Sequence, residues 1–227
     1  MSDRVLLAID TATTRIVVAT GTAAGSVLDS LDWPAGYRHG ETLLPAIERL
    51  LADGGRAREA IGGVIVGTGP GTFTGLRVGL ATAKGIAHGL GCPIVGISTG
   101  SALIASAAED LGVDPSRVEL LLPAGPADRI LVGDPTGPRL LPAGEDPPAS
   151  ADVIAIALDL ETRAPADALE RGERARLGLA AAFMRLGAAR LRDGDADDLA
   201  RLVPEYVTLP RGAARAGGEV TWSHDPR

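Results

Sequence analysis

The order of strand-like and helix-like runs in the first half of the chain limits its fold more than any other feature. Three short apolar or β-branched runs within residues 5–33 are separated by turn residues, which predicts three antiparallel strands in a meander. From residue 43 to residue 111, helical runs alternate with buried-strand runs. A meander followed by alternating helices and strands is typical of a mixed sheet with helices on its faces. We therefore expect an α/β fold of the kind found in ribonuclease-H-like and actin-like domains.

The expected elements divide the chain unevenly. Before residue 113 they are strands at 5–10, 16–20, 26–33, 61–66 and 93–97 and helices at about 43–51, 76–90 and 99–111. After residue 113 they are strands at 118–122, 129–132 and 153–158, a loop at 135–150, and helices at 175–191 and 196–202. We predict a complete first lobe over residues 1–112, a reduced second lobe over 113–209, and a disordered tail over 210–227.

Composition and charge exclude several classes of protein. The 227 residues carry a formal net charge of −7, which does not fit a large basic footprint for nucleic acid. The single cysteine, Cys92, excludes an internal disulfide. No apolar run reaches the length of a membrane helix, and the first residues lack the architecture of a signal peptide. We therefore expect a cytoplasmic protein that is not attached to a membrane.

A glycine-rich segment at residues 67–75 joins a predicted buried strand to a predicted helix. Such a loop presents backbone N–H groups and a helix N-terminus to an anion. The segment does not match the P-loop pattern, because Leu76 follows its last glycine, nor the dinucleotide pattern, because Thr74 replaces the third glycine. Two interpretations stay open, a vestigial phosphate-type loop and a tight turn. The candidate residues are Gly69, Gly71 and Thr72.

A second candidate loop follows the first predicted strand. Asp10 ends that strand, and Thr11 and Thr13 come directly after it. A carboxylate among hydroxyl groups at this place is how actin-like ATPases hold Mg²⁺ and phosphate. The alternative is a turn stabilised by aspartate and threonine side chains, and the loop taken alone favours this alternative. We treat the three residues as a second vestigial phosphate-type loop.

The predicted helix at 76–90 carries small residues along one face. Glycine inside a helix costs about 0.5–1 kcal/mol relative to alanine, so repeated glycine indicates the close approach of another backbone. A second apolar stripe on the same helix is available for packing on its own sheet. We infer an interface with another chain. It would be formed by Gly75, Leu76, Gly79, Thr82, Ala83 and Ile86.

Other candidate sites lack the residues that their chemistry needs. The acidic run at 193–198 lacks the glycine and the distal acid of a calcium loop. His39, His88 and His224 are far apart in the sequence and do not have metalloprotease spacing. No serine stands in a Gly-x-Ser-x-Gly context. We therefore predict no catalytic residue, no metal site and no cofactor.

Four segments together resemble the bacterial tRNA threonylcarbamoyladenosine biosynthesis protein family TsaB, also called YeaZ. They are residues 7–13 (LAIDTAT), 38–45 (RHGETLLP), 66–85 (VGTGPGTFTGLRVGLATAKG) and 204–207 (PEYV). The segment at 66–85 is the most specific, and the resemblance is good over about residues 4–105. It departs from the family at Gly40, where the family has serine, and at 123–125 in the second lobe.

The resemblance implies an actin/Hsp70-like fold with a shortened second lobe, in a scaffold subunit that is not an enzyme. Such a subunit pairs with the catalytic paralogue TsaD and with the ATPase TsaE. The family uses the pairing surface for a homodimer or for TsaD, and whether the isolated chain is a homodimer or a monomer stays open. The complex transfers threonylcarbamoyl from its adenylate to N6 of adenosine 37 in tRNA. This subunit contacts tRNA only indirectly, through the complex.

The resemblance also assigns roles to positions in this chain. The predicted helix at 76–90, with small residues along one face, corresponds to the family's pairing surface. Gly79→Arg is therefore expected to abolish co-purification with the TsaD paralogue while the chain stays folded. The paralogue's metal-binding histidine pair corresponds to Thr99 and Leu103 in this sequence. Neither side chain is a useful ligand for iron or zinc. The resemblance therefore implies that this chain does not hold the catalytic metal.

A function of a different class stays open from the residues alone. The chain is alternatively a stand-alone actin-like ATPase or small-molecule kinase that uses Asp10 and the loop at 67–75. That activity needs adenosine and phosphate contacts from the second lobe, and no second glycine-rich loop follows a strand after residue 113. Nucleotide hydrolysis or tight nucleotide binding by the purified chain would distinguish the two functions.

Overall fold

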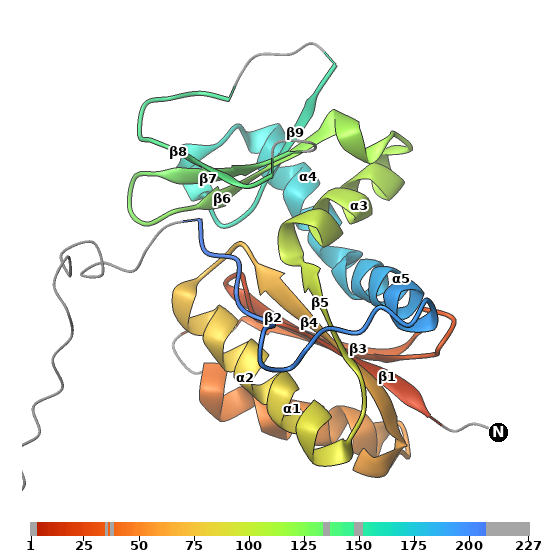
Figure 1. Ribbon diagram of the computed structural model, residues 1–227. Helices are drawn as coiled ribbons and strands as arrows, with labels where there is room; N and C mark the ends of the chain where they lie inside the picture. Colours follow the sequence, from red (N-terminus) through yellow and green to blue (C-terminus); the bar gives the residue numbers. More distant parts are fainter. Residues whose placement is uncertain (1–3, 35, 37–38, 134–136, 148–151, 208–227) are drawn as a thin grey trace, which may run out of the picture.

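Two mixed β-sheets, one above the other in Figure 1, form the framework of the molecule. The computed structural model describes residues 4–34, 36, 39–133, 137–147 and 152–207. The predicted tail at 210–227 lies outside the described residues. Within them, no helix is both long enough and apolar enough to cross a membrane.

The first sheet has five strands in the order β3-β2-β1-β4-β5. The strands are β1 (Val5–Asp10), β2 (Arg15–Gly21), β3 (Val27–Pro34), β4 (Ile61–Gly69) and β5 (Ile94–Ser98). β1, β2 and β3 pair antiparallel, while β4 runs parallel to both β1 and β5. The central strand β1 is buried along its whole length, whereas the edge strand β3 alternates between partly buried and exposed residues. The predicted meander and mixed sheet are confirmed.

The second sheet has four strands in the order β8-β7-β6-β9. The strands are β6 (Val118–Pro123), β7 (Arg129–Val132), β8 (Arg139–Leu141) and β9 (Ile154–Ala157). It repeats the first four positions of the first sheet, with a meander followed by a parallel strand. Among the described residues it has no fifth strand, so the expected α/β fold with a reduced second lobe is confirmed. The predicted loop at 135–150 is wrong where it contains β8, a three-residue edge strand too short to give a periodic signal.

Within the described residues, five α-helices cover the sheets. They are α1 (His39–Asp53), α2 (Phe73–Leu90), α3 (Thr99–Leu111), α4 (Ala166–Leu177) and α5 (Leu179–Arg192). Short 3₁₀ turns occur at Arg58–Ala60, Pro115–Arg117 and Glu161–Arg163. α1 and α2 pack on one face of the first sheet, and α5 packs on the other (Figure 1).

The predicted helix at 175–191 is confirmed over 179–191, which lie in α5, but it is wrong as a single helix, because 175–177 end α4 and the two helices meet at Gly178. A Cβ at this position would overlap the hydroxyl of Ser106 on α3, and that hydroxyl donates to the carbonyl of Ala175 at 2.7 Å. The chain therefore turns where it touches α3, a contact that helical periodicity does not reveal. The predicted short helix at 196–202 is also wrong, since that segment consists of turns and irregular backbone.

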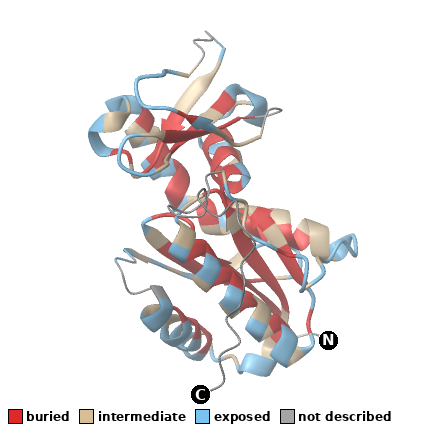
Figure 2. Cartoon of the chain, turned by 60° about the vertical axis from the view of Figure 1, so that its left-hand side comes forward, coloured by how far each residue is buried: buried red, intermediate tan, exposed pale blue. Residues whose placement is uncertain are grey.

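The main hydrophobic core runs through both lobes. It joins one face of the first sheet to α3, α5 and the inner face of the second sheet, and Phe183 on α5 is its largest fully buried side chain. Figure 2 shows the buried residues continuing from one sheet to the other. Helix α5 approaches the first sheet closely, because a Cβ at Gly187 would meet the side chain of Ile65 at 2.5 Å. Thus a helix from the predicted second-lobe range packs against the first sheet.

Candidate functional site

The two candidate loops meet at one edge of the first sheet. The parallel strands β1, β4 and β5 all end at this edge, so Asp10, the glycine-rich loop and Thr99 come together. The hydroxyl of Thr99 donates to Asp10 Oδ1 at 2.7 Å, and the backbone N–H of Gly69 donates to the Thr99 hydroxyl at 3.3 Å. Sequence analysis did not place Thr99 in this group, although its position directly after the third parallel strand is a signal that would have indicated it.

The Asp10 carboxyl group is buried, and only one of its two oxygens accepts a hydrogen bond from the described residues. Its side chain is 1 % exposed, and Oδ2 has no hydrogen-bond partner among the described residues. Burial raises the pKa of Asp10 from 3.8 to about 6, against the lowering effects of the Thr99 hydroxyl and of Arg176. Glycine is required opposite this carboxyl, because a Cβ at Gly67 would overlap Asp10 Oδ1.

The two candidate loops bind each other directly. The backbone N–H of Thr72 donates to the carbonyl of Ala12 at 2.7 Å, and the Thr11 hydroxyl donates to the carbonyl of Gly75 at 2.7 Å. A Cβ at Gly71 would overlap the same Ala12 carbonyl. The glycines at this edge therefore allow close contact between two loops of one chain.

The second lobe also reaches this edge, through Asp159 and Arg176. Arg176 is 4 % exposed and donates to Asp159 Oδ1 at 2.7 Å and to the Thr13 hydroxyl at 3.2 Å. The backbone N–H and the hydroxyl of Thr14 both donate to the Asp159 carboxylate, at 2.9 and 2.7 Å. Sequence analysis missed both residues, because more than 140 positions separate them from the loop that they contact and no local pattern marks them.

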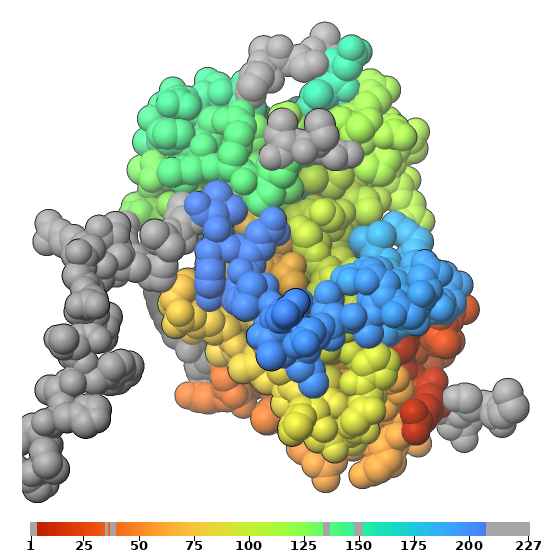
Figure 3. Space-filling view, viewed as in Figure 1, coloured from red at the N-terminus to blue at the C-terminus, as the bar shows by residue number. Residues whose placement is uncertain are grey.

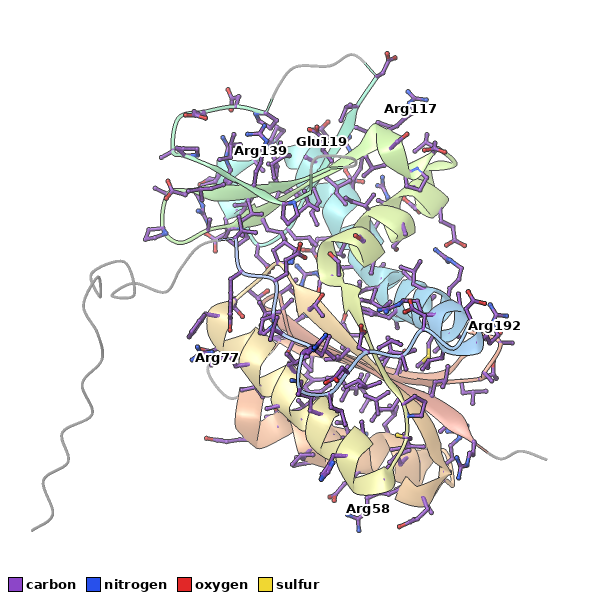
Figure 4. All side chains as sticks on the ribbon, viewed as in Figure 1. Arg58, Arg77, Arg117, Glu119, Arg139 and Arg192 are labelled. Atoms are coloured by element: carbon purple, nitrogen blue, oxygen red, sulfur yellow. The ribbon has the colours of Figure 1, made fainter. Side chains whose placement is uncertain are left out.

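The segment at 204–207 packs over the glycine-rich loop. The backbone N–H of Glu205 donates to the Thr68 carbonyl at 2.7 Å, and burial raises the pKa of Glu205. The rings of Tyr206 and Phe73 lie 5.2 Å apart, and Arg77 donates to the Tyr206 hydroxyl at 3.1 Å. In Figure 3 this blue segment lies between α2 and the second lobe, and Figure 4 labels Arg77 beside it.

The predicted interface is corrected for four of its six residues. Gly75, Leu76, Gly79 and Ala83 are buried within the chain itself, while Thr82 and Ile86 remain partly exposed. A Cβ at Gly75 would overlap the Thr11 carbonyl, and one at Gly79 would overlap the Thr11 hydroxyl. The glycines do mark a close approach, to the Thr11 carbonyl at Gly75 and to the Thr11 side chain at Gly79, and the loop after β1 makes it rather than another chain. Gly79→Arg would therefore disrupt the fold, contrary to the earlier expectation.

This correction gives a prediction for two glycines on α2. Gly79→Ala is expected to lower the free energy of unfolding by about 1–3 kcal/mol, because the added methyl group overlaps the Thr11 hydroxyl. Gly85→Ala is expected to raise it by about 0.5–1 kcal/mol, because this exposed helical position has open space around it. Guanidinium unfolding followed by circular dichroism measures both values, and equal stabilisation by the two substitutions would contradict the packing described.

No group of three or more His, Cys, Asp or Glu side chains suited to a metal ion occurs in the part of the chain that the structure describes. Cys92 is buried, and burial raises the pKa of its thiol.

Comparisons with known proteins agree with the fold. The family model of TsaD, tRNA N6-adenosine threonylcarbamoyltransferase, matches residues 34–201. The TsaB protein of Haemophilus influenzae is 34% identical over 109 residues, which are 48% of this chain and 45% of that protein. The TsaB protein of Escherichia coli is 36% identical over 94 residues, which are 41% of this chain and 40% of that protein. The aligned part of the chain thus spans less than half the length of these curated relatives.

A solved structure extends the likeness over more of the chain. YeaZ from Pseudomonas aeruginosa is 25% identical with a TM-score of 0.66, and the match covers 91% of this chain and all of that one. Because the family model matches well over half of the sequence, the chain belongs to the TsaD family and, within it, to the TsaB (YeaZ) group.

Proposed function

We propose that the chain is a non-catalytic, cytoplasmic subunit of the machinery that makes N6-threonylcarbamoyladenosine at position 37 of tRNA. It pairs with the catalytic paralogue TsaD and with the ATPase TsaE, and tRNA is met only through the complex. Family membership supports the pathway. The observation that carries the non-catalytic role is that the chain's own groups fill the loop after β1. There the Thr72 N–H donates a hydrogen bond to the Ala12 carbonyl, and the Thr14 hydroxyl donates one to the Asp159 carboxylate.

The residues at the positions of the paralogue's metal ligands support the same assignment. Thr99 is fully buried and its hydroxyl is engaged with Asp10, and Leu103 lies in the core with 0% exposure. A buried leucine and a threonine bonded to a carboxyl do not offer a site for iron or zinc. The catalytic metal is then the partner's.

The corrected pairing surface is the groove between α1 and α2, which we call the α1–α2 groove. It has a volume of about 600 Å³ and a mainly apolar lining. Leu44 on α1 is 51% exposed, and the partly exposed Thr82 and Ile86 from the original interface prediction line the groove from α2. Figure 4 labels Arg58, which also lines it. An exposed apolar groove of this kind fits a helix of a partner subunit, either the TsaD paralogue or a second copy of this chain.

Gly85 offers a sharp test of this surface. The residue lines the groove with open space around its Cα, so Gly85→Arg places a long cation in the groove without disturbing the core. We expect Gly85→Arg to abolish co-purification with the TsaD paralogue and to leave the melting temperature unchanged or higher. Gly85→Ala is the matched control, because it makes the same gain in helix propensity without the bulk, and it should retain pairing. Normal pairing by Gly85→Arg would refute the assignment of the surface.

The stand-alone ATPase or kinase alternative is tested on the purified chain alone. We expect no ATP hydrolysis above a protein-free blank, because Asp159 and Arg176 occupy the loop that would hold phosphate. Hydrolysis that is lost in Asp10→Ala would overturn the non-catalytic proposal and favour the alternative.

A further inference from the structure

Asp159 has a left-handed backbone conformation, which is uncommon in residues other than glycine but which aspartate adopts more readily than most. Its φ is +57°, and among the described residues Glu161 is the only other non-glycine with a positive φ. A side chain in the left-handed region generally costs roughly 1–2 kcal/mol, and aspartate offsets part of this cost when its short polar side chain forms local hydrogen bonds. Asp159 nevertheless holds this conformation with a side chain that is only 9% exposed. Interactions of the side chain therefore hold the backbone in place.

The groups that contact the Asp159 carboxylate are of the kinds that bind an oxyanion. The carboxylate accepts from the Thr14 N–H at 2.9 Å, from the Thr14 hydroxyl at 2.7 Å and from the Arg176 guanidinium at 2.7 Å. A backbone N–H, a hydroxyl and a guanidinium converging on two oxygens form a charge-assisted anion site. The guanidinium is itself buried and is held in position by Thr13 and Glu173.

We propose that Asp159 is an internal oxyanion that occupies an anion-binding site of the loop after β1 and thereby latches the second lobe onto the first. The donors come from both lobes, Thr14 from the loop between β1 and β2 and Arg176 from α4, and the carboxylate precedes the turn at Glu161–Arg163. When the carboxylate is removed, the site takes a free carboxylate of matching size. This inference concerns the lobes of the chain itself. It shares the Asp159–Thr14 contact with the proposed function, but its test measures stability and not subunit pairing or ATP hydrolysis.

Chemical rescue of Asp159→Gly tests the latch. Glycine adopts a positive φ without strain, so this substitution removes the carboxylate and leaves Thr14 and Arg176 unchanged. Acetate has the size of the deleted side chain. We expect the melting temperature of Asp159→Gly to rise saturably when sodium acetate replaces sodium chloride at equal ionic strength, by about 3–5 °C more than the melting temperature of the wild type does.

Two controls separate rescue from general salt effects. Glu161→Gly relaxes the other positive φ at an exposed position, and it should show no preference for acetate. Asp159→Asn places a neutral amide where the carboxylate lies and so leaves no room for acetate. This variant should be destabilised and should not respond to acetate either. A response of Asp159→Gly to acetate that is no larger than that of the wild type would overturn the proposal.

Hydrogen exchange gives a local readout of the same site. The Thr14 amide should be protected in the wild type, exposed in Asp159→Gly and protected again in acetate. If Asp159→Gly does not fold in chloride, its refolding yield in the two salts replaces the melting temperature. Recovery in acetate alone supports the latch, and equal or absent recovery in both salts overturns it.

Discussion

Phe183→Ala is expected to lower the free energy of unfolding by about 3–5 kcal/mol. The ring is 1% exposed and lies in the core cluster that joins both sheets. Its removal leaves a cavity in this core, where α5 packs against the first sheet and α3. Denaturant unfolding followed by circular dichroism gives the value. Leu177→Ala is the control, because this leucine is 81% exposed and its loss should change stability by less than about 0.5 kcal/mol.

The same variant tests whether the lobes unfold together. Since one core runs through both sheets, Phe183→Ala should increase hydrogen exchange in β4 and in β6 by similar amounts. Faster exchange confined to one sheet would show that each lobe has an independent core.

Asp10 is expected to make stability depend on pH between about 4 and 6. Its pKa is 3.8 unfolded and about 6 folded, so the folded state binds more protons than the unfolded state in this range. Stability that is present below pH 4 is therefore lost as pH rises through 6. A shift of this size corresponds to about 3 kcal/mol. Asp10→Asn should remove this loss, so at pH 8 its free energy of unfolding should exceed that of the wild type by up to about 3 kcal/mol.

The measurement is denaturant unfolding of wild type and Asp10→Asn at a series of pH values from 4 to 8. The difference between the two proteins isolates Asp10 from Glu205, whose pKa is also raised. Thr99→Val supplies a second check. It removes a hydrogen bond that favours the charged carboxylate, so the pH-dependent region should move to higher pH. A difference between wild type and Asp10→Asn that does not vary with pH would contradict the buried carboxyl.

Local patterns in the sequence were sufficient to predict the first sheet and to single out the two loops, but not that the loops meet. Strand-like runs gave the meander, and parallel strands that end at one edge bring Asp10 and the glycine-rich loop together. The glycine spacing of α2 correctly indicated a close contact. It did not say which backbone approaches, and the structure places the loop after β1 there, so the inference of another chain was wrong for Gly75 and Gly79.

The parts that sequence reasoning missed depend on contacts between distant segments. Gly178 breaks a continuous helical pattern only because α3 lies against it. Asp159 and Arg176 meet Thr14 through the packing of the lobes, and the sequence around each of them looks like an ordinary exposed turn or helix. β8 is too short for periodicity to detect.

The position of α5 has a consequence for synthesis on the ribosome. Residues 5–98 contain every strand of the first sheet, yet the helix that covers one of its faces ends at Arg192. A nascent chain that has emerged only as far as the first sheet therefore offers residues such as Val17 and Ile65 to water or to a chaperone. Folding of the first lobe is then completed only after α5 has emerged from the ribosome, and the two halves should not be separable by expression as independent fragments.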